Sequence, residues 1–172
     1  EAGLIKQYTA RDLPHLELEL SLALGLREYV KKCRIPGFAL ALSGGRDSSM
    51  CALRIGRMFR YDQPELSEEA LKAHVRERFV CAYMGTDNSG SATRDAAAAL
   101  SAELGADHLD GAIQSTMDVH LDVFEQMTGT RLSWEDPSHD IPLQNVQARL
   151  RGGLIWMIAN VRRFLLISTS NK

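Results

Sequence analysis

A short glycine-containing segment carries the residue types best suited to phosphate chemistry. It reads Ser43-Gly44-Gly45-Arg46-Asp47-Ser48. Two adjacent glycines let the backbone approach an anion closely, because neither residue has a β-carbon. The hydroxyls of Ser43 and Ser48 are suitable donors to phosphate oxygens. A carboxylate repels a phosphate, so Asp47 makes chemical sense if it holds a cation that bridges to the phosphates.

The elements on either side of this segment are those that present a phosphate site in an α/β protein. Residues 38–42 form a continuous apolar run, which is typical of a strand buried on both faces. Residues 47–60 have the apolar spacing of a helix. Amide groups at the start of such a helix are free, and the helix dipole adds partial positive charge there. The alternative is an ordinary glycine turn followed by an Asp/Ser helix cap.

The remaining chain alternates helical and strand patterns after a first helix at residues 13–32. Further strands are expected at residues 79–84, 108–113 and 164–167, and further helices at 91–104, 115–127 and 143–161. Residues 62–77 read as a polar insertion and 128–142 as a loop. This order predicts an α/β fold, a three-layer sandwich with a mainly parallel sheet and helices on both faces. Ligands in such sheets bind beyond the carboxyl ends of the strands.

Composition and charge exclude several functional classes. The chain has 172 residues with 20 Lys and Arg against 22 Asp and Glu, and this formal charge of −2 argues against broad nucleic-acid binding. No apolar run approaches the roughly 18–20 residues of a membrane span, and the first residues lack a signal-peptide pattern. The three cysteines form no CxxC pair, which argues against a zinc site or disulfide framework and favours a reducing cytoplasm.

Three segments resemble a known superfamily and one family within it. Residues 38–48 resemble the pyrophosphate loop of the N-type ATP pyrophosphatases, which have an adenine nucleotide alpha hydrolase-like fold and adenylate a substrate before a nucleophile displaces AMP. Residues 144–152, QNVQARLRG, are similar to the N-x-QARxRG helix of the NAD synthetases. Residues 168–172, STSNK, are similar to the segment that follows the next strand in that family. The long loop and this last segment resemble the glutamine-dependent members, which carry a glutaminase domain upstream.

The resemblance implies a set of site residues. Those expected to bind ATP are Ser43, Gly44, Gly45, Arg46, Asp47, Ser48, Ser49, Thr169 and Lys172. Those expected to bind deamido-NAD are Asn145, Arg149 and Arg151. Asp47 and Ser48 are the expected catalytic residues, with Mg²⁺ held at Asp47. A solvated helix face is an equal alternative for Arg151, and Arg46 departs from the family, which usually has an apolar residue there.

The implied activity is ATP-dependent amidation of deamido-NAD by ammonia, through an adenylated carboxylate and with release of AMP and pyrophosphate. The family also implies a homodimer or higher homo-oligomer with substrate at the interface. Two alternatives stay open: another member of the superfamily, such as GMP synthetase or a tRNA-modifying enzyme, or an inactive nucleotide-binding fragment. We expect residues 1–13 to be a linker and 14–172 to be a synthetase domain truncated at its C-terminal end, with little activity alone.

Overall fold

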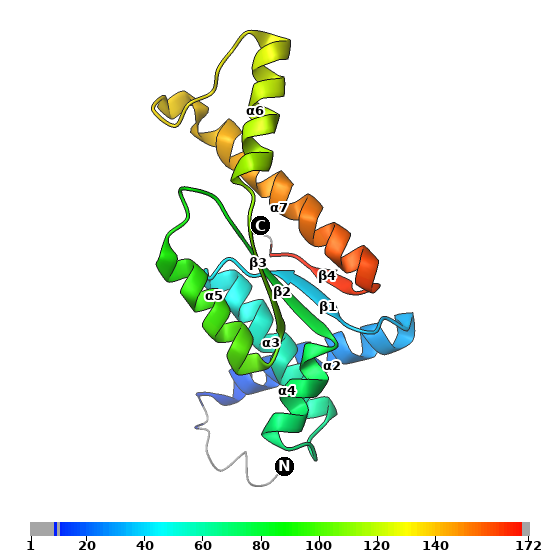
Figure 1. The fold of residues 1–172 in the computed structure, drawn as a ribbon. Helices are drawn as coiled ribbons and strands as arrows, with labels where there is room; N and C mark the ends of the chain where they lie inside the picture. Colours follow the sequence, from blue (N-terminus) through cyan, green and yellow to red (C-terminus); the bar gives the residue numbers. More distant parts are fainter. Residues whose placement is uncertain (1–8, 10, 170–172) are drawn as a thin grey trace.

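A four-stranded parallel sheet lies at the centre of the computed structural model, which describes residues 9 and 11–169 (Figure 1). The strands stand in the order β3-β2-β1-β4, with bounds β1 (Phe38–Ala41), β2 (Phe79–Gly85), β3 (Asp107–Ala112) and β4 (Leu165–Ile167). Phe38 lies opposite both Phe79 of β2 and Leu165 of β4, and every pairing is parallel. The carboxyl ends of all four strands therefore lie at one edge, as the alternating pattern predicts.

Helices cover both faces of this sheet. The first face packs against α2 (Leu13–Cys33), α3 (Arg46–Asp62), α4 (Glu68–Arg76) and α5 (Ser91–Leu104), and the second packs against α7 (Asp140–Arg162). Alternate residues of β1 belong to different cores: Phe38 and Leu40 to the first, Ala39 to the second with Ile155 and Ala159 of α7. A strand covered on both sides needs apolar residues throughout, which is why residues 38–42 form a continuous apolar run. The expected three-layer sandwich is confirmed.

One helix lies where the sequence suggested only a polar insertion. Helix α4 begins after Ser67, whose hydroxyl accepts a hydrogen bond of 3.2 Å from the amide of Ala70. It buries only Leu71 and Val75, which are four residues apart and so share a helix face. On the opposite side of the molecule, α7 begins at Asp140, inside the expected loop, and follows a short 3₁₀ turn at Pro137–His139 (Figure 1). Pro142 is tolerated because it lies in the first turn of the helix.

Helix α6 (Gln114–Thr128) and the first half of α7, the last helix of the fold, extend well beyond the sheet. Helix α6 follows β3 directly, and together with the first half of α7 it projects from the carboxyl edge as an arm (Figure 1). Apolar side chains on this arm are exposed, with Met127 80% accessible. Among the helices that the structure describes, none combines the length and apolar character that a membrane span requires.

Candidate functional site

The loop between β1 and α3 has a shape that its own side chains fix. The Ser48 hydroxyl lies 3.0 Å from the Ser43 hydroxyl, accepts from the Ser43 amide at 3.2 Å and donates to the Gly45 carbonyl at 3.1 Å. The Gly45 amide donates in turn to the Ser43 hydroxyl at 3.2 Å. Ser48 is buried, whereas Ser43 and Gly45 are exposed, so the Ser48 hydroxyl anchors the loop from its inner side. The two serines expected to face a phosphate therefore also hold the loop together.

Gly44 has a backbone conformation and a neighbour that both require glycine. Its φ is +74°, in the left-handed region that side-chain-bearing residues rarely adopt. A β-carbon built on Gly44 would lie 2.1 Å from the carbonyl oxygen of Thr93, in the first turn of α5. The loop is therefore pressed directly against the backbone of α5.

The start of α3 presents unpaired amides. Gly45 is the N-cap residue and has no side chain to cap the helix, and the first amide bonded to it is that of Ser49, at 3.0 Å. Within residues 11–169, the amides of Arg46, Asp47 and Ser48 have no hydrogen-bond acceptor. Free amides at a helix N-terminus, together with the helix dipole, form an anion-binding position.

Asp47 is exposed in the first turn of α3. In the described part of the chain, no cluster of three or more His, Cys, Asp or Glu side chains could hold a metal by itself. Mg²⁺ usually binds proteins through one or two carboxylates and takes its other ligands from phosphates and water. A single exposed carboxylate beside an anion-binding helix start fits that donor set.

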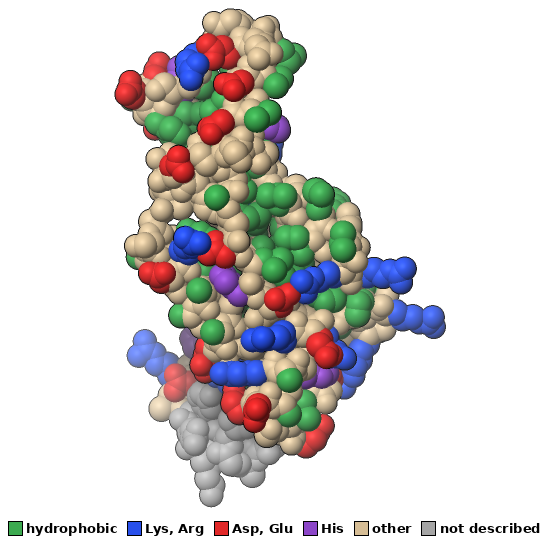
Figure 2. All heavy atoms as spheres, in the orientation of Figure 1, with side chains coloured by type: hydrophobic (Ala, Val, Ile, Leu, Met, Phe, Trp, Pro, Cys, Tyr) green, Lys and Arg blue, Asp and Glu red, His purple; other side chains and the backbone are tan. Residues whose placement is uncertain are grey.

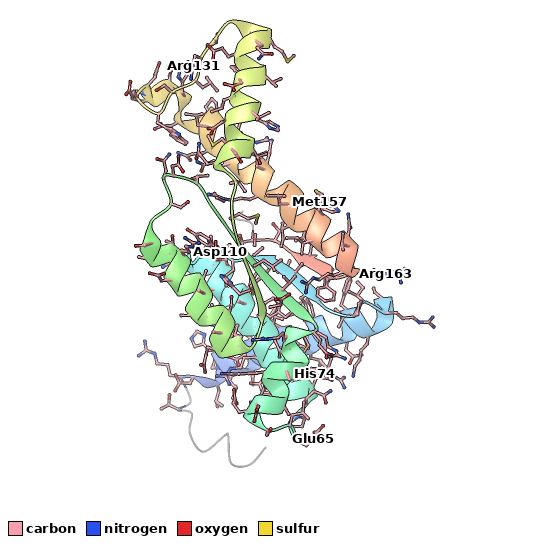
Figure 3. All side chains as sticks on the ribbon, in the orientation of Figure 1. Glu65, His74, Asp110, Arg131, Met157 and Arg163 are labelled. Atoms are coloured by element: carbon pink, nitrogen blue, oxygen red, sulfur yellow. The ribbon has the colours of Figure 1, made fainter. Side chains whose placement is uncertain are left out.

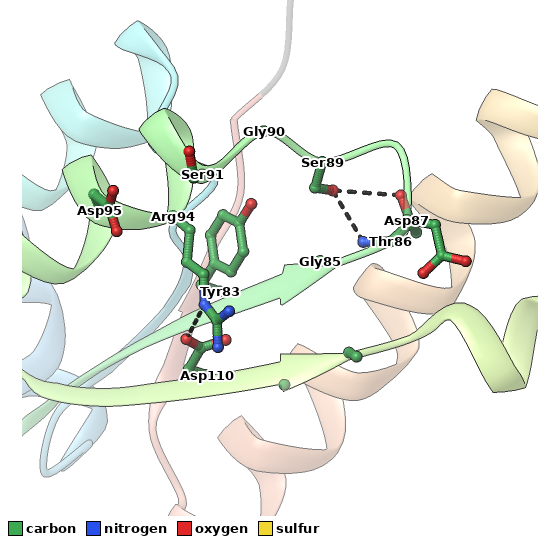
Figure 4. A pocket seen from close by; sticks show the side chains of 12 residues that line it. Tyr83, Gly85, Thr86, Asp87, Ser89, Gly90, Ser91, Arg94, Asp95 and Asp110 are labelled. Atoms are coloured by element: carbon green, nitrogen blue, oxygen red, sulfur yellow. Dashed lines mark hydrogen bonds and ion pairs between the residues drawn. The ribbon is translucent and has the colours of Figure 1, made fainter.

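Two adjoining cavities lie over the carboxyl edge of the sheet. The smaller, about 270 Å³, is lined by Ser43 of the loop and Arg151 of α7, among others. The larger, about 530 Å³, extends toward β3 and includes Asp87, Arg94 and Asp110 (Figure 4). Both are lined by Tyr83, Ser89 and Gly90. The loop therefore opens onto the smaller cavity, and the larger cavity adjoins it beside the ends of β2 and β3.

An ion pair forms part of the wall of the larger cavity. Arg94 Nε donates to Asp110 Oδ2 at 2.5 Å, joining α5 to β3 (Figure 4). The hydrogen bond that Arg94 donates to the Asp110 carboxylate is the main cause that raises the pKa of Arg94. On the facing turn, the amide of Thr86 donates to the Ser89 hydroxyl at 2.9 Å. Neither Arg94 nor Asp110 was expected from the sequence, although Asp110 lies near the carboxyl end of β3, where ligands of such sheets bind.

The three residues expected to bind deamido-NAD lie on different faces of α7. Arg151 Nε donates to the carbonyl of Met84 at 3.0 Å, so its side chain reaches the end of β2 and lines the smaller cavity. Arg149 and Asn145 are exposed, and the Arg149 guanidinium donates to the Asn145 carbonyl at 3.2 Å. The structure thus brings Arg151 to the loop and leaves the other two on an outer face of the helix.

The remaining expected ATP contacts follow β4. Thr169 is exposed two residues beyond Ile167, the end of the strand that pairs with β1, so it belongs to the same edge as the loop. Ser49 is half-buried in the first turn of α3. Lys172 lies outside the described residues.

This three-layer arrangement, with a serine- and glycine-containing loop between its first strand and the next helix, defines the fold of the N-type ATP pyrophosphatases. The sequence model of the NAD synthase family matches residues 20–172, and the chain belongs to that family. The resemblance inferred from the three sequence segments is confirmed.

Relatives with known names agree with this assignment. The chain is 33% identical over 177 residues to the glutamine-dependent NAD(+) synthetase of Oryza sativa subsp. indica, covering 86% of this chain and 24% of that protein. The crystal structure of a glutamine-dependent NAD(+) synthetase from Cytophaga hutchinsonii superposes with a TM-score of 0.85 at 33% identity, covering 91% of this chain and 31% of the other. An NH3-dependent NAD synthetase from Campylobacter jejuni gives 0.67 at 26% identity, covering 91% and 57%. The chain spans about a quarter of the length of the curated relatives it matches.

Proposed function

We propose that this chain forms the ATP-binding part of an NAD synthetase, which amidates deamido-NAD to NAD with consumption of ATP. Membership of the NAD synthase family supports the activity. The structural observation that supports ATP binding is the row of amides from Arg46 to Ser48, which have no acceptor among the described residues. These amides lie beside a cavity at the carboxyl edge of the sheet. Such a row suits the triphosphate of ATP, because each amide aims a donor at a phosphate oxygen.

The chain's own residues would bind and orient the reactants. The nicotinate carboxylate oxygen forms a bond to the α-phosphorus of ATP, and the bond from that phosphorus to the bridging oxygen breaks. Pyrophosphate leaves and is held at the loop by the amides that begin α3. The nitrogen of ammonia then bonds to the carboxyl carbon, and the bond from this carbon to the oxygen that joins it to phosphorus breaks. AMP leaves with that oxygen, and the nitrogen loses a proton to give the amide. Positioning and charge neutralisation supply most of the rate in such transfers.

Mg²⁺ at Asp47 would neutralise the charge that develops on the departing pyrophosphate. The position of Asp47 supports this assignment, because its carboxylate is exposed in the first turn of α3, beside the amides assigned to phosphate. Thr169 and Lys172 are assigned to the phosphates on the β4 side of the loop. The larger cavity, with Asp87 and Ser89 on its wall, is the natural place for the nucleoside of ATP.

Arg151 is assigned to the deamido-NAD side of the reaction centre, because its guanidinium reaches the cavity beside Ser43. Asn145 and Arg149 would contact the same substrate from the exposed face of α7. We place the substrate between two copies of the chain, since the exposed face of α7 does not border the loop.

We assign the chain to a homodimer, which this arrangement needs. Apolar side chains gather over α7 on the face shown in Figure 2, and Met157 projects outward from this helix in Figure 3. Trp156 is 62% accessible on the same helix. Exposed apolar surface of this kind marks an interaction site. We infer that a glutaminase domain of the same polypeptide supplies the ammonia, as the names of the relatives suggest. We assign the protein to the cytoplasm, a compartment that suits the exposed free thiol of Cys33.

The proposal is tested by measuring AMP and NAD from deamido-NAD, ATP and ammonia with the full natural polypeptide that carries this chain. Formation of the two products in equal amounts supports it. XMP and tRNA serve as alternative substrates in parallel reactions. AMP formed with either of them, and none with deamido-NAD, would reject NAD synthesis in favour of another adenylating reaction.

A further inference from the structure

The first turn of α5 has no buried side chain to hold it in place. Residues 91–96 are all exposed, and the first buried side chain of the helix is that of Ala97. The position of this turn therefore depends on polar contacts. Since its Thr93 carbonyl packs directly against Gly44, any movement of the turn changes the wall of the phosphate loop.

Two sets of polar contacts hold the turn. Thr93 Oγ1 donates to the Gly90 carbonyl at 2.8 Å and lies 3.2 Å from the Tyr83 hydroxyl of β2. The next residue, Arg94, is bonded to Asp110 of β3 at 2.5 Å (Figure 4). The turn is thus tied to β2 by a neutral contact and to β3 by a charged one. The charged one is the stronger type of hydrogen bond.

We propose that the ion pair between Arg94 and Asp110 is a latch that holds the first turn of α5 against Gly44, and so positions the phosphate loop and sets its affinity for polyphosphate. Arg94 is a positioning residue here, because it acts on the loop through the backbone of Thr93. The latch itself does not depend on the proposed function, whereas its effect on affinity rests on it. Half-exposed ion pairs contribute little individually, so the effect of the latch is modest.

The latch is tested first without any ligand. Hydrogen exchange is measured at the amides of Ser43, Gly45 and Ser49, which are bonded within the loop. In Arg94→Ala and in Asp110→Asn these amides are expected to exchange about threefold to fivefold faster, the scale of a half-exposed ion pair. Arg94→Lys keeps a cation beside Asp110 and is expected to restore most of the protection. Unchanged exchange in both disrupting variants would overturn the latch.

Binding of three probes then separates positioning from direct contact. Sodium tripolyphosphate has no nucleoside to occupy the larger cavity that Arg94 lines, whereas adenosine has no phosphate to bind at the loop. If Arg94 positions the loop, Arg94→Ala weakens tripolyphosphate and ATP by the same factor, about threefold to fivefold, and adenosine is unaffected. Loss of adenosine and ATP affinity with unchanged tripolyphosphate affinity would mean that Arg94 contacts the nucleoside, and would reject the proposal.

A matched control uses another arginine ion pair. Arg131, at the tip of the arm in Figure 3, bonds Glu125 at 3.0 Å, far along the chain from the loop. Arg131→Ala is expected to change neither exchange nor binding. Wild-type chain that binds neither ATP nor tripolyphosphate would reject the proposed function, while the exchange rates would still decide whether the latch exists.

Discussion

Arg151 Nε donates a hydrogen bond of 3.0 Å to the carbonyl oxygen of Met84, although the two residues are 67 positions apart in the chain. Met84 is buried near the end of β2, so this carbonyl has little access to water. The contact joins α7 to the sheet at the edge where the phosphate loop lies. It places a cation in the smaller cavity beside Ser43.

Replacing Arg151 should affect both stability and binding. Arg151→Ala leaves the Met84 carbonyl without its partner and is expected to lower the free energy of unfolding by about 1–2 kcal/mol. Urea unfolding of the variant measures this loss. Arg149→Ala is the matched control: its guanidinium bonds only the carbonyl of Asn145 one turn earlier, and its loss should cost less than about 0.5 kcal/mol. Equal costs for the two variants would contradict the role given to the Met84 contact.

The glycine at position 44 is expected to be irreplaceable. Gly44→Ala must accommodate both the left-handed backbone and an overlap with the Thr93 carbonyl, and should destabilise the chain by about 2–4 kcal/mol. Gly129 provides the control, because its φ is also positive, at +69°, but open space surrounds it. Gly129→Ala should cost only about 1–2 kcal/mol of backbone strain. Thermal unfolding of the two variants separates the cost of backbone strain from the cost of steric overlap. A smaller loss of stability in Gly44→Ala than in Gly129→Ala would refute the close contact between Gly44 and Thr93.

Acid stability should depend on Asp62, at the end of α3. Burial alone would raise the pKa of Asp62, but hydrogen bonds from Arg27, Gln63 and Lys31 outweigh it and lower the pKa from 3.8 to about 2. Because the folded state favours the carboxylate, this contribution is complete above the unfolded pKa of 3.8. It is lost as the pH falls toward about 2.

Asp62→Asn should therefore lose about 1 kcal/mol at neutral pH, allowing for partial solvent screening, and should show a flatter stability curve between about pH 4 and pH 2. Urea unfolding across this pH range provides the measurement. Glu65→Gln removes an exposed carboxylate nearby and should leave the curve unchanged. A wild-type curve that is already flat in this range would show that the ion pairs of Asp62 do not stabilise the fold.

The role given to Asp47 predicts a specific change in metal dependence. Asp47→Asn keeps the size of the side chain but removes the charge that would hold Mg²⁺. Calorimetric titration with ATP should show that Mg²⁺ strengthens binding to the wild-type chain, and that this gain falls at least about tenfold in the variant. Binding of tripolyphosphate without metal should stay the same or tighten, because one repulsive charge has gone. An undiminished effect of Mg²⁺ would assign the metal to another residue.

The layers of the fold could be predicted because local patterns determine them. The continuous apolar run at residues 38–42 indicates a strand buried on both faces, and α5 matches its expected bounds of 91–104. Helix α4 was missed because it covers only a corner of the core and so needs few apolar residues. A helix with only two buried positions has too weak a hydrophobic periodicity to be recognised from its sequence.

The site was predictable only where it is local in sequence. The loop at residues 43–48 could be found because its residues are adjacent and its neighbours are a strand and a helix. Arg94 and Asp110 are 16 positions apart, and the packing of α5 against the sheet that contains β3 brings them together. The family resemblance named Asn145, Arg149 and Arg151 together, but a sequence motif does not show which face of a helix meets the sheet, and of the three only Arg151 reaches it.

The most direct test of the central claim, that the loop between β1 and α3 binds the triphosphate of ATP, is a crystal structure of the chain with ATP bound. We predict phosphate oxygens within hydrogen-bond distance of the amides of Arg46, Asp47 and Ser48, with the nucleoside in the cavity that Arg94 and Asp110 line. Phosphates bound elsewhere, with these three amides still unpaired, would contradict the account.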